Sequence, residues 1–240
     1  MANKKQTVIE LKNISKTYFG AIDTPVLFDI NLAILRGSLN SIIGQSGSGK
    51  STLLNILGTL DKPTLGEVLV NGQMVHNLNN DKLARLRNQT MGFVFQFHYL
   101  LPEFTVLENV LIPISIEKNG KVTERDKQKA MELIGLVGLS EKMNVISDSI
   151  SGGQQQRTAI ARALMNEPDI ILADEPTGNL DSDTSRSIYK LFCKINRDLG
   201  TTFIIVTHDD RIAAQTDRII EIKDGRIITD KVNKNVACPI

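Results

Sequence analysis

Short apolar runs separated by turn residues fill the beginning of the chain. They lie at 8–11, 26–35, 39–43 and 68–70, and their lengths are typical of β-strands. Asn71-Gly72 follows the last run, and this dipeptide favours a tight β-hairpin. We therefore predict an N-terminal antiparallel β subdomain.

A long helical stretch interrupts this pattern. Residues 80–90 are helix-like and 91–96 return to strand, while 104–166 are predicted as helices joined by polar linkers at 117–126 and 140–149. Helices of this length need an apolar neighbour to bury their inner faces. We expect them to form an inserted α-helical subdomain.

After this stretch, strands and helices alternate. The predicted strands are 170–173, 203–206 and 218–222, and the predicted helices are 185–199 and 211–215. Such alternation predicts a mainly parallel sheet. The expected fold class is α/β, as one domain over 1–240, with a core of about 1–96 and 167–230 and a helical insertion of about 97–166.

Composition narrows the class of protein. The chain has 240 residues and a formal net charge of +1, so it lacks the basic excess of a nucleic-acid-binding protein. Its two cysteines, Cys193 and Cys238, are too few for a disulfide framework, and no apolar stretch is long enough for a signal peptide or a membrane span. These features predict a cytosolic protein in a reducing compartment that does not bind nucleic acid.

The segment GQSGSGKS at 44–51 matches a phosphate-binding loop between a strand and a helix. Its glycines allow consecutive N–H groups to point at phosphate oxygens, and the following helix adds its positive dipole end. Lys50 would reach the β- and γ-phosphates, and Ser51 would ligate Mg²⁺. A glycine-rich turn without a ligand is the alternative. The expected nucleotide-binding residues are Gly44, Ser46, Gly47, Ser48, Gly49, Lys50, Ser51 and Thr52.

Three apolar strands end in residues suited to phosphoryl transfer. Strand 39–43 leads into the phosphate loop, the second leads into Asp174-Glu175, and the third leads into Thr207-His208. If these strands are neighbours, their carboxyl ends meet at one edge of the sheet. Asp174 would then hold Mg²⁺, Glu175 would deprotonate the attacking water, and His208 would contact the γ-phosphate. The alternatives are a capped helix start for the carboxylates and an ordinary strand-end histidine.

Ser151-Gly152-Gly153-Gln154 precedes a helical run from 155 to 164. A serine at a helix start, followed by two glycines, offers free N–H groups and the helix dipole to a phosphate. The same four residues also fit an ordinary helix N-cap, and this alternative stays open.

Together, the phosphate loop, the segment ISGGQQQR at 150–157, strand 170–175 and His208 resemble the ATP-binding cassette family over 8–228. The resemblance implies a P-loop NTPase core, ATP and Mg²⁺ as cofactors, and ATP hydrolysis. It also implies that Gln96 is a hinge glutamine with catalytic and metal-binding roles. Ile150, where the family usually has Leu, and Gln45, which is often Pro, are departures away from the phosphate contacts.

Further roles follow from the same resemblance. Tyr18 would stack on adenine, although it and Phe19 could instead pack internally. The loop 178–181 would cross a dimer interface, where Asp181 would be one of the ATP-binding residues. Ser151, Gly152, Gly153 and Gln154 would contact the ATP held by a second copy. We therefore expect a homodimer around two ATPs.

The stretch MGFVFQFHYLLP at 91–102, followed by LENV at 107–110, is similar to the branch that serves macrolide exporters and lipoprotein-release complexes. In that branch the region receives a cytoplasmic helix of the membrane subunit. Phe97, Tyr99, Leu100 and Leu101 follow the strand in a loop-like stretch, where aromatic residues often face a partner. Packing of these side chains in the core is the alternative.

The expected function is that of an ATPase subunit that drives a separate membrane permease from the cytoplasmic face of the inner membrane. Three alternatives remain: a division-associated mechanotransmission complex, a soluble cassette ATPase that acts on DNA or ribosomes, and a regulatory cassette that binds ATP without hydrolysis. Glu175 and His208 argue against the last. The transported substrate is not visible in this chain, because the membrane partner selects it.

Overall fold

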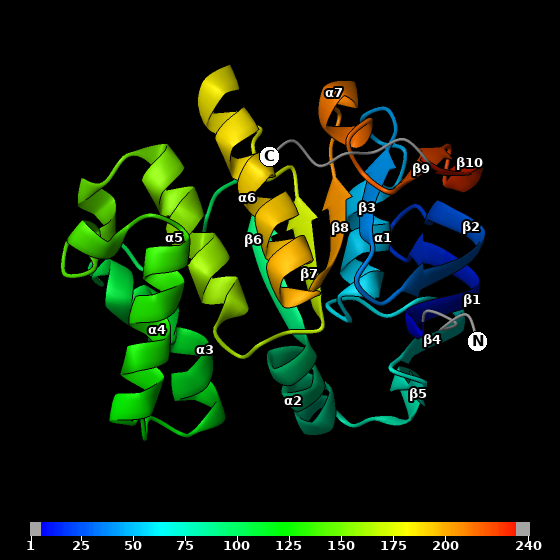
Figure 1. Ribbon diagram of the computed structural model, residues 1–240. Helices are drawn as coiled ribbons and strands as arrows, with labels where there is room; N and C mark the ends of the chain where they lie inside the picture. Colours follow the sequence, from blue (N-terminus) through cyan, green and yellow to red (C-terminus); the bar gives the residue numbers. More distant parts are fainter. Residues whose placement is uncertain (1–5, 234–240) are drawn as a thin grey trace, which may run out of the picture.

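The computed structural model describes residues 6–233, which form two β-sheets and a group of helices at one side (Figure 1). The smaller sheet is antiparallel, with strand order β2-β1-β4-β5. Its strands are β1 (Thr7–Tyr18), β2 (Thr24–Leu35), β4 (Leu65–Val70) and β5 (Gln73–Met74). The pairing of Val70 with Gln73 confirms the hairpin predicted at Asn71-Gly72.

The larger sheet has the order β10-β9-β3-β8-β7-β6. Its strands are β3 (Leu39–Ile43), β6 (Met91–Phe95), β7 (Ile170–Asp174), β8 (Thr202–Val206), β9 (Arg218–Lys223) and β10 (Arg226–Val232). The pairs of β3 with β8 and β9, and of β7 with β6 and β8, are parallel. The three strands that end in functional residues are therefore adjacent, as predicted. The antiparallel edge strand β10 was not predicted, although Asp224-Gly225 is a hairpin signal.

Alternate residues of the central strands enter two apolar cores. Ile171 and Ala173 of β7 face the core that contains α5 (Gly152–Leu164) and α6 (Ser182–Leu199). Ile170 and Leu172 face the core that contains α1 (Lys50–Leu57). A parallel strand is apolar throughout because both faces are covered. Cys193 is buried on α6, and Cys238 lies outside the described residues.

The remaining helices are α2 (Asn80–Thr90), α3 (Val106–Glu117), α4 (Glu124–Leu136), α7 (Asp210–Ala213) and the short 3₁₀ turns Val75–Asn77, Ser140–Lys142 and Ser147–Ser149. Helices α3, α4 and α5 lie together at one side of the larger sheet (Figure 1). Over residues 6–233, none of the helices has the length and apolarity that crossing a membrane requires.

Several helix boundaries differ from the predictions, and side-chain caps explain two of them. Helix α4 begins inside the predicted 117–126 linker because Thr123 and Asp126 form a capping box. Helix α6 begins before the predicted residue 185 because Asp181 accepts hydrogen bonds from the N–H groups of its first turn. Helix α5 includes Gly152, earlier than the predicted residue 155. The helix predicted at 211–215 is the single turn α7.

Candidate functional site

The loop between β3 and α1 depends on glycine at two positions. Gly44 has φ of 152°, and a Cβ there would lie 2.1 Å from the carbonyl oxygen of Ile222. Gly49 has φ of 101°, and a Cβ there would lie 2.9 Å from Leu27 Cδ2. Gly49 is also the N-cap of α1 and provides no side-chain cap, so the first-turn N–H groups of α1 stay available to an anion.

A cavity of about 520 Å³ opens over this loop. Lys50 Nζ donates hydrogen bonds of 2.8 Å to the carbonyl oxygens of Gly44 and Gln45, which holds the ammonium group beside the loop. The predicted residues that line the cavity are Ser46, Gly47, Gly49, Lys50, Ser51, Thr52, Gln96, Glu175 and His208. Val26 and Val206 also line it, and no feature of the sequence predicted their position.

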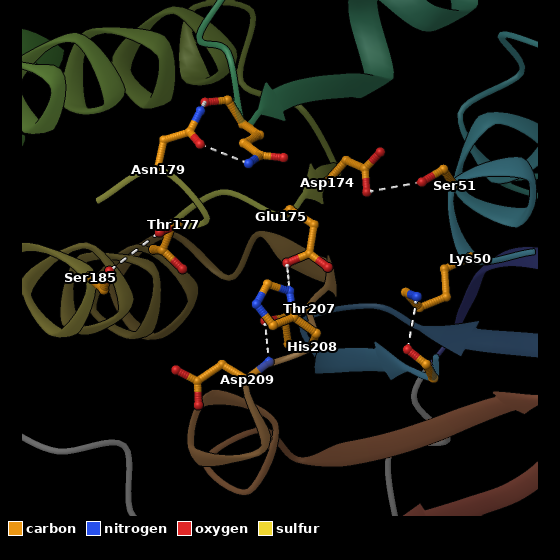
Figure 2. A network of polar contacts seen from close by, with 12 residues as sticks. Lys50, Ser51, Asp174, Glu175, Thr177, Asn179, Ser185, Thr207, His208 and Asp209 are labelled. Carbon is orange, nitrogen blue, oxygen red and sulfur yellow. Dashed lines mark hydrogen bonds and ion pairs between the residues drawn. The ribbon is translucent and has the colours of Figure 1, made fainter. Parts of the chain in front are cut away.

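Asp174, the last residue of β7, faces the start of α1. Ser51 Oγ donates a hydrogen bond of 3.4 Å to Asp174 Oδ1 (Figure 2). Burial raises the pKa of the Asp174 carboxyl, and the charge of Glu175 raises it further, while Ser51 and Lys50 act in the opposite direction. A cation beside this carboxylate would offset the cost of its desolvation.

Glu175 and His208 meet across the ends of β7 and β8. His208 Nδ1 lies 2.9 Å from Glu175 Oε2, and Figure 2 shows the two side chains facing each other. Glu175 has φ of 45°, and its N–H donates to the carbonyl oxygen of Val206 at 3.0 Å. A left-handed conformation is uncommon for a residue with a side chain, and it clusters at functional sites. Here it turns the Glu175 carboxylate toward His208 and the cavity.

The residues available to hold Mg²⁺ fit that ion in chemistry. Ser51 offers a hydroxyl, Asp174 a carboxylate and Gln96 an amide oxygen, and Mg²⁺ prefers oxygen ligands. Among residues 6–233, no group of three or more His, Cys, Asp or Glu side chains gathers as a metal cage. Mg²⁺ in nucleotide sites is held by one or two carboxylates together with phosphate oxygens, so the limited protein donor set is appropriate.

Gln96, directly after β6, pairs with Asn179 of the loop 178–181, a contact that the sequence did not predict. Its Nε2 donates to Asn179 Oδ1 at 2.9 Å, and Asn179 Nδ2 donates to the Gln96 carbonyl oxygen at 3.4 Å (Figure 2). Asn179 belongs to the loop that ends at Asp181. The pair therefore links two segments that are 83 residues apart in the sequence.

The predicted signature residues form the start of α5. Ser151 Oγ accepts a hydrogen bond from the Gln154 N–H, and Gln154 Oε1 accepts one from the Ser151 N–H, which completes a capping box. A Cβ at Gly153 would lie 2.6 Å from Thr184 Cγ2. The N-cap alternative is thus correct locally, and Ser151, Gly152, Gly153 and Gln154 do not line the cavity of their own chain.

Asp181 and Tyr18 also lie outside the cavity lining. The Asp181 carboxylate accepts hydrogen bonds from the N–H groups of Asp183 and Thr184 and from the Thr184 hydroxyl, so it caps α6. The Tyr18 hydroxyl donates to Asp61 Oδ2 at 2.9 Å, and Lys16 Nζ lies 4.7 Å from the centre of its ring. The proposed adenine contact of Tyr18 stays a prediction.

The segment after Gln96 carries the exposed apolar side chains of the predicted docking surface. Phe97 is 67%, Tyr99 64% and Leu101 44% exposed. Leu100 is half-buried. Beside this segment is a groove of about 380 Å³, which is lined by residues of α2, β6, α3 and α5. The alternative of core packing does not fit the exposed side chains.

Comparisons with known proteins agree with this geometry. The ABC transporter family model matches residues 27–178. The chain is 46% identical over 219 residues to the lipoprotein-releasing system ATP-binding protein LolD of Shewanella denitrificans, covering 91% of this chain and 93% of that protein. It is 47% identical to LolD 1 of Rhodopseudomonas palustris over 222 residues, covering 92% of this chain and 98% of that protein.

Solved structures are similar over the same length. The dimeric structure of MJ0796, a bacterial ABC transporter cassette, has a TM-score of 0.86 and 44% sequence identity, covering 95% of this chain and 99% of that chain. A dimeric post-hydrolysis state of MJ0796 bound to ADP and Pi has a TM-score of 0.86 and 43% identity, with the same coverage. The predicted fold class is confirmed by this similarity.

Proposed function

The chain belongs to the ABC transporter family, as an ATP-hydrolysing subunit, and from this premise we propose that it drives a separate membrane permease of the lipoprotein-release or export type. The observation that carries the proposal is the convergence of Lys50, Asp174, Glu175 and His208 at the ends of three adjacent parallel strands. The sequence relatives named as lipoprotein-releasing ATP-binding proteins support the choice of branch.

The catalytic roles follow from the positions of the side chains. Lys50, held beside the phosphate loop, contacts the β- and γ-phosphates, and the free N–H groups of α1 bind the phosphate oxygens. Glu175 accepts a proton from the attacking water, and His208 contacts the γ-phosphate and fixes the Glu175 carboxylate. Ser51, Asp174 and Gln96 would hold Mg²⁺, which would supply positive charge to stabilise the transferring phosphoryl group.

We further propose a homodimer with two ATPs between head-to-tail copies. Ser151, Gly152 and Gly153 are separate from the cavity of their own chain, yet they lie at the start of α5, where N–H groups are available to an anion. A second copy would bring this helix end to the γ-phosphate. The dimeric structures of MJ0796 support this assembly.

The permease docks on the Phe97–Leu101 segment, residues 97–101, and on the neighbouring groove. The exposed Phe97, Tyr99 and Leu101 side chains support this position. The chain would then work at the cytoplasmic face of the inner membrane, with the helical subdomain, residues 97–166, moving against the core as ATP is bound and hydrolysed. Gln96 lies at the boundary and contacts both the cavity and Asn179.

A division-associated mechanotransmission complex is the second candidate, because it would use the same ATPase site and the same docking surface. An ATPase acting on DNA or ribosomes is disfavoured by the net charge of +1. A regulatory cassette without hydrolysis is disfavoured by the Glu175 and His208 pair.

The test first takes a candidate permease from the genes that flank this one, chosen because it encodes membrane-spanning helices. The two proteins would be coexpressed, copurified and reconstituted in liposomes that carry a lipoprotein, and ATP-dependent release of the lipoprotein would be measured. The Glu175→Gln variant is the matched control, since it should assemble without turnover. Release only with the wild-type chain supports the transport function. Copurification and stimulated hydrolysis without release favour mechanotransmission, and failure of the two proteins to associate overturns the proposal.

A further inference from the structure

The groove beside the Phe97–Leu101 segment combines an apolar lining with positive charge. Phe93, Phe95, Pro113 and Ile116 provide much of the apolar surface, and Arg87 and Arg162 also line the groove. No Asp or Glu is among the described residues that line it. An apolar surface with unbalanced charge of one sign favours a partner that carries the opposite charge.

Arg162, in the last turn of α5, is bound only to neutral groups. Its Nη1 donates to the Tyr99 carbonyl oxygen and its Nη2 to the His98 carbonyl oxygen, both at 2.6 Å. Within residues 6–233, no carboxylate lies within ion-pair distance of its guanidinium. Burial lowers the pKa of Arg162, which is the sign of a desolvated charge. Buried charges are normally paired.

Arg87, on α2, is likewise hydrogen-bonded to a backbone carbonyl and not to a carboxylate. Its Nη1 donates to the Thr59 carbonyl oxygen at 2.9 Å, and the described part of the chain gives it no ion-pair partner either. The Asn166 Oδ1, also at the groove, is buried and accepts no hydrogen bond from the described residues. The groove therefore retains both donor and acceptor capacity.

Three acidic residues on or directly after α3, α4 and α5 are engaged with other side chains. Glu117 on α3 accepts a hydrogen bond from Gln89, and Asp126 on α4 pairs with Lys118 at 2.7 Å. Glu167, after α5, pairs with Lys129 at 2.7 Å. None of the described carboxylates pairs with Arg162, so any ion-pair partner for it would come from outside residues 6–233.

We propose that the groove receives an apolar segment of the membrane partner that carries an Asp or Glu, and that this carboxylate pairs with Arg162. The inference rests on the proposed function and specifies the chemistry of its partner. Arg162 has five N–H donors in a planar fork, of which the two carbonyl contacts occupy only part, so a carboxylate can be added without breaking them.

The position of Arg162 gives the ion pair a mechanical consequence. The two carbonyls that it binds belong to His98 and Tyr99, which have φ of 53° and 47°. Two consecutive residues in the left-handed region cost conformational energy, and Arg162 offsets this by holding both carbonyls. Arg162 belongs to α5 and binds the carbonyls of the segment that follows Gln96. A carboxylate paired with Arg162 would therefore be linked through this one side chain to both parts of the chain.

The experiment uses the copurified permease as its probe. Each Asp and Glu in the cytoplasmic segments of the permease is replaced in turn by Asn or Gln. This chain keeps its wild-type sequence in these measurements, so a folding defect of this chain cannot explain a loss of binding. In parallel, Arg162→Gln and Arg87→Gln are compared with Arg85→Gln, which removes the same charge from the exposed side of α2. Affinity is measured by titrating the labelled chain onto the permease in nanodiscs.

We expect the replacement of one permease carboxylate to weaken binding by about 30-fold or more, as for truncation of a buried charge pair. Arg162→Gln should have an effect of the same size, and Arg85→Gln should change the affinity less than about threefold. Binding should be restored when the charges are exchanged, that is, when Arg162→Glu in this chain is combined with Arg in place of the permease carboxylate. If the wild-type chain does not bind the permease, the proposed function fails. If it binds, and no carboxylate replacement weakens binding by more than about threefold, only the ion pair is refuted.

Discussion

The side-chain amide of Gln96 is oriented by Asn179, which accepts its N–H at 2.9 Å. The loop also packs closely against the Gln96 side chain at the preceding residue, because a Cβ at Gly178 would lie 2.8 Å from Gln96 Nε2. With the amide nitrogen occupied, the Gln96 oxygen is the end of the side chain that remains for a metal ion in the cavity. Asn179 therefore acts as a positioning residue for a proposed Mg²⁺ ligand.

We predict that Asn179→Ala raises the Mg²⁺ concentration needed for half-maximal ATPase activity by about fivefold, the effect of losing one hydrogen bond of roughly 1 kcal/mol. Asn179→Asp retains an acceptor for the amide and should restore most of the wild-type requirement. Mg²⁺ titrations of activity and of fluorescent-nucleotide binding provide the measurement. The same Mg²⁺ requirement in all three proteins would show that Asn179 does not orient Gln96.

Glu175→Gln should preserve ATP affinity and reduce hydrolysis by 100-fold or more, roughly the contribution of a general base. The amide keeps the shape of the side chain and its contact with His208, but it cannot accept the proton. Lys50→Ala should instead weaken ATP binding. Nucleotide-binding isotherms and single-turnover rates separate the two effects. Turnover of Glu175→Gln within about threefold of wild type, under ~1 kcal/mol, would exclude Glu175 from the role.

The local motifs predicted the nucleotide site well. The strand at 39–43 matches β3 residue for residue, and the phosphate loop follows it, because the loop and its helix are specified within one short segment. Asp174 and His208 lie at the same edge of the sheet as the phosphate loop, because parallel strands align their carboxyl ends. This topological rule applies even though the residues are far apart in the sequence.

Contacts between loops could not be predicted in the same way. The pairing of Gln96 with Asn179 and the binding of Arg162 to two carbonyls depend on backbone paths that neither segment encodes alone. Asp181 was predicted as an ATP-binding residue at the dimer interface, and its role as the cap of α6 was missed. Strand β10 was missed although Asp224-Gly225 marks its hairpin.

The proposed composite site predicts dimerisation by ATP. The Glu175→Gln variant should be largely monomeric without nucleotide and dimeric with Mg-ATP, because ATP binds both copies at once. Ser151→Arg should abolish the dimer, since the larger cationic side chain occupies the start of α5, whereas Ser140→Arg, at another exposed serine, should not. Light scattering at saturating Mg-ATP checks this. A persistent monomer whose hydrolysis is unaffected by Ser151→Arg would contradict the composite site.

The ion pair of Asp126 and Lys118 predicts a pH-dependent stability. Hydrogen bonds from Lys118, and then from Thr123, lower the pKa of Asp126 below its unperturbed value of 3.8. A lowered folded-state pKa stabilises the protein above the unfolded value, and the stabilisation is lost as the pH falls through the folded one. Asp126→Asn should therefore lower the melting temperature clearly at pH 6 and by a smaller amount at pH 3, because pH 3 lies below the unfolded pKa but above the folded one. The exposed Asp148→Asn is the control, and a gap of equal size at both pH values would contradict this origin.

If the Phe97–Leu101 segment is a docking surface, changes in its exposed side chains should abolish permease binding without affecting the stability of the isolated chain. Tyr99 and Leu101 are 64% and 44% exposed, so replacing both with Asp should leave the melting temperature and ATP affinity of the isolated chain close to wild type. In an apolar interface the same two carboxylates would each cost several kcal/mol, and copurification with the permease and stimulation of hydrolysis should be lost. Leu199→Asp, at an exposed leucine on α6, is the matched control. Core packing of Tyr99 and Leu101 would instead give an unstable double variant, and a folded variant that binds the permease normally would refute docking at this segment.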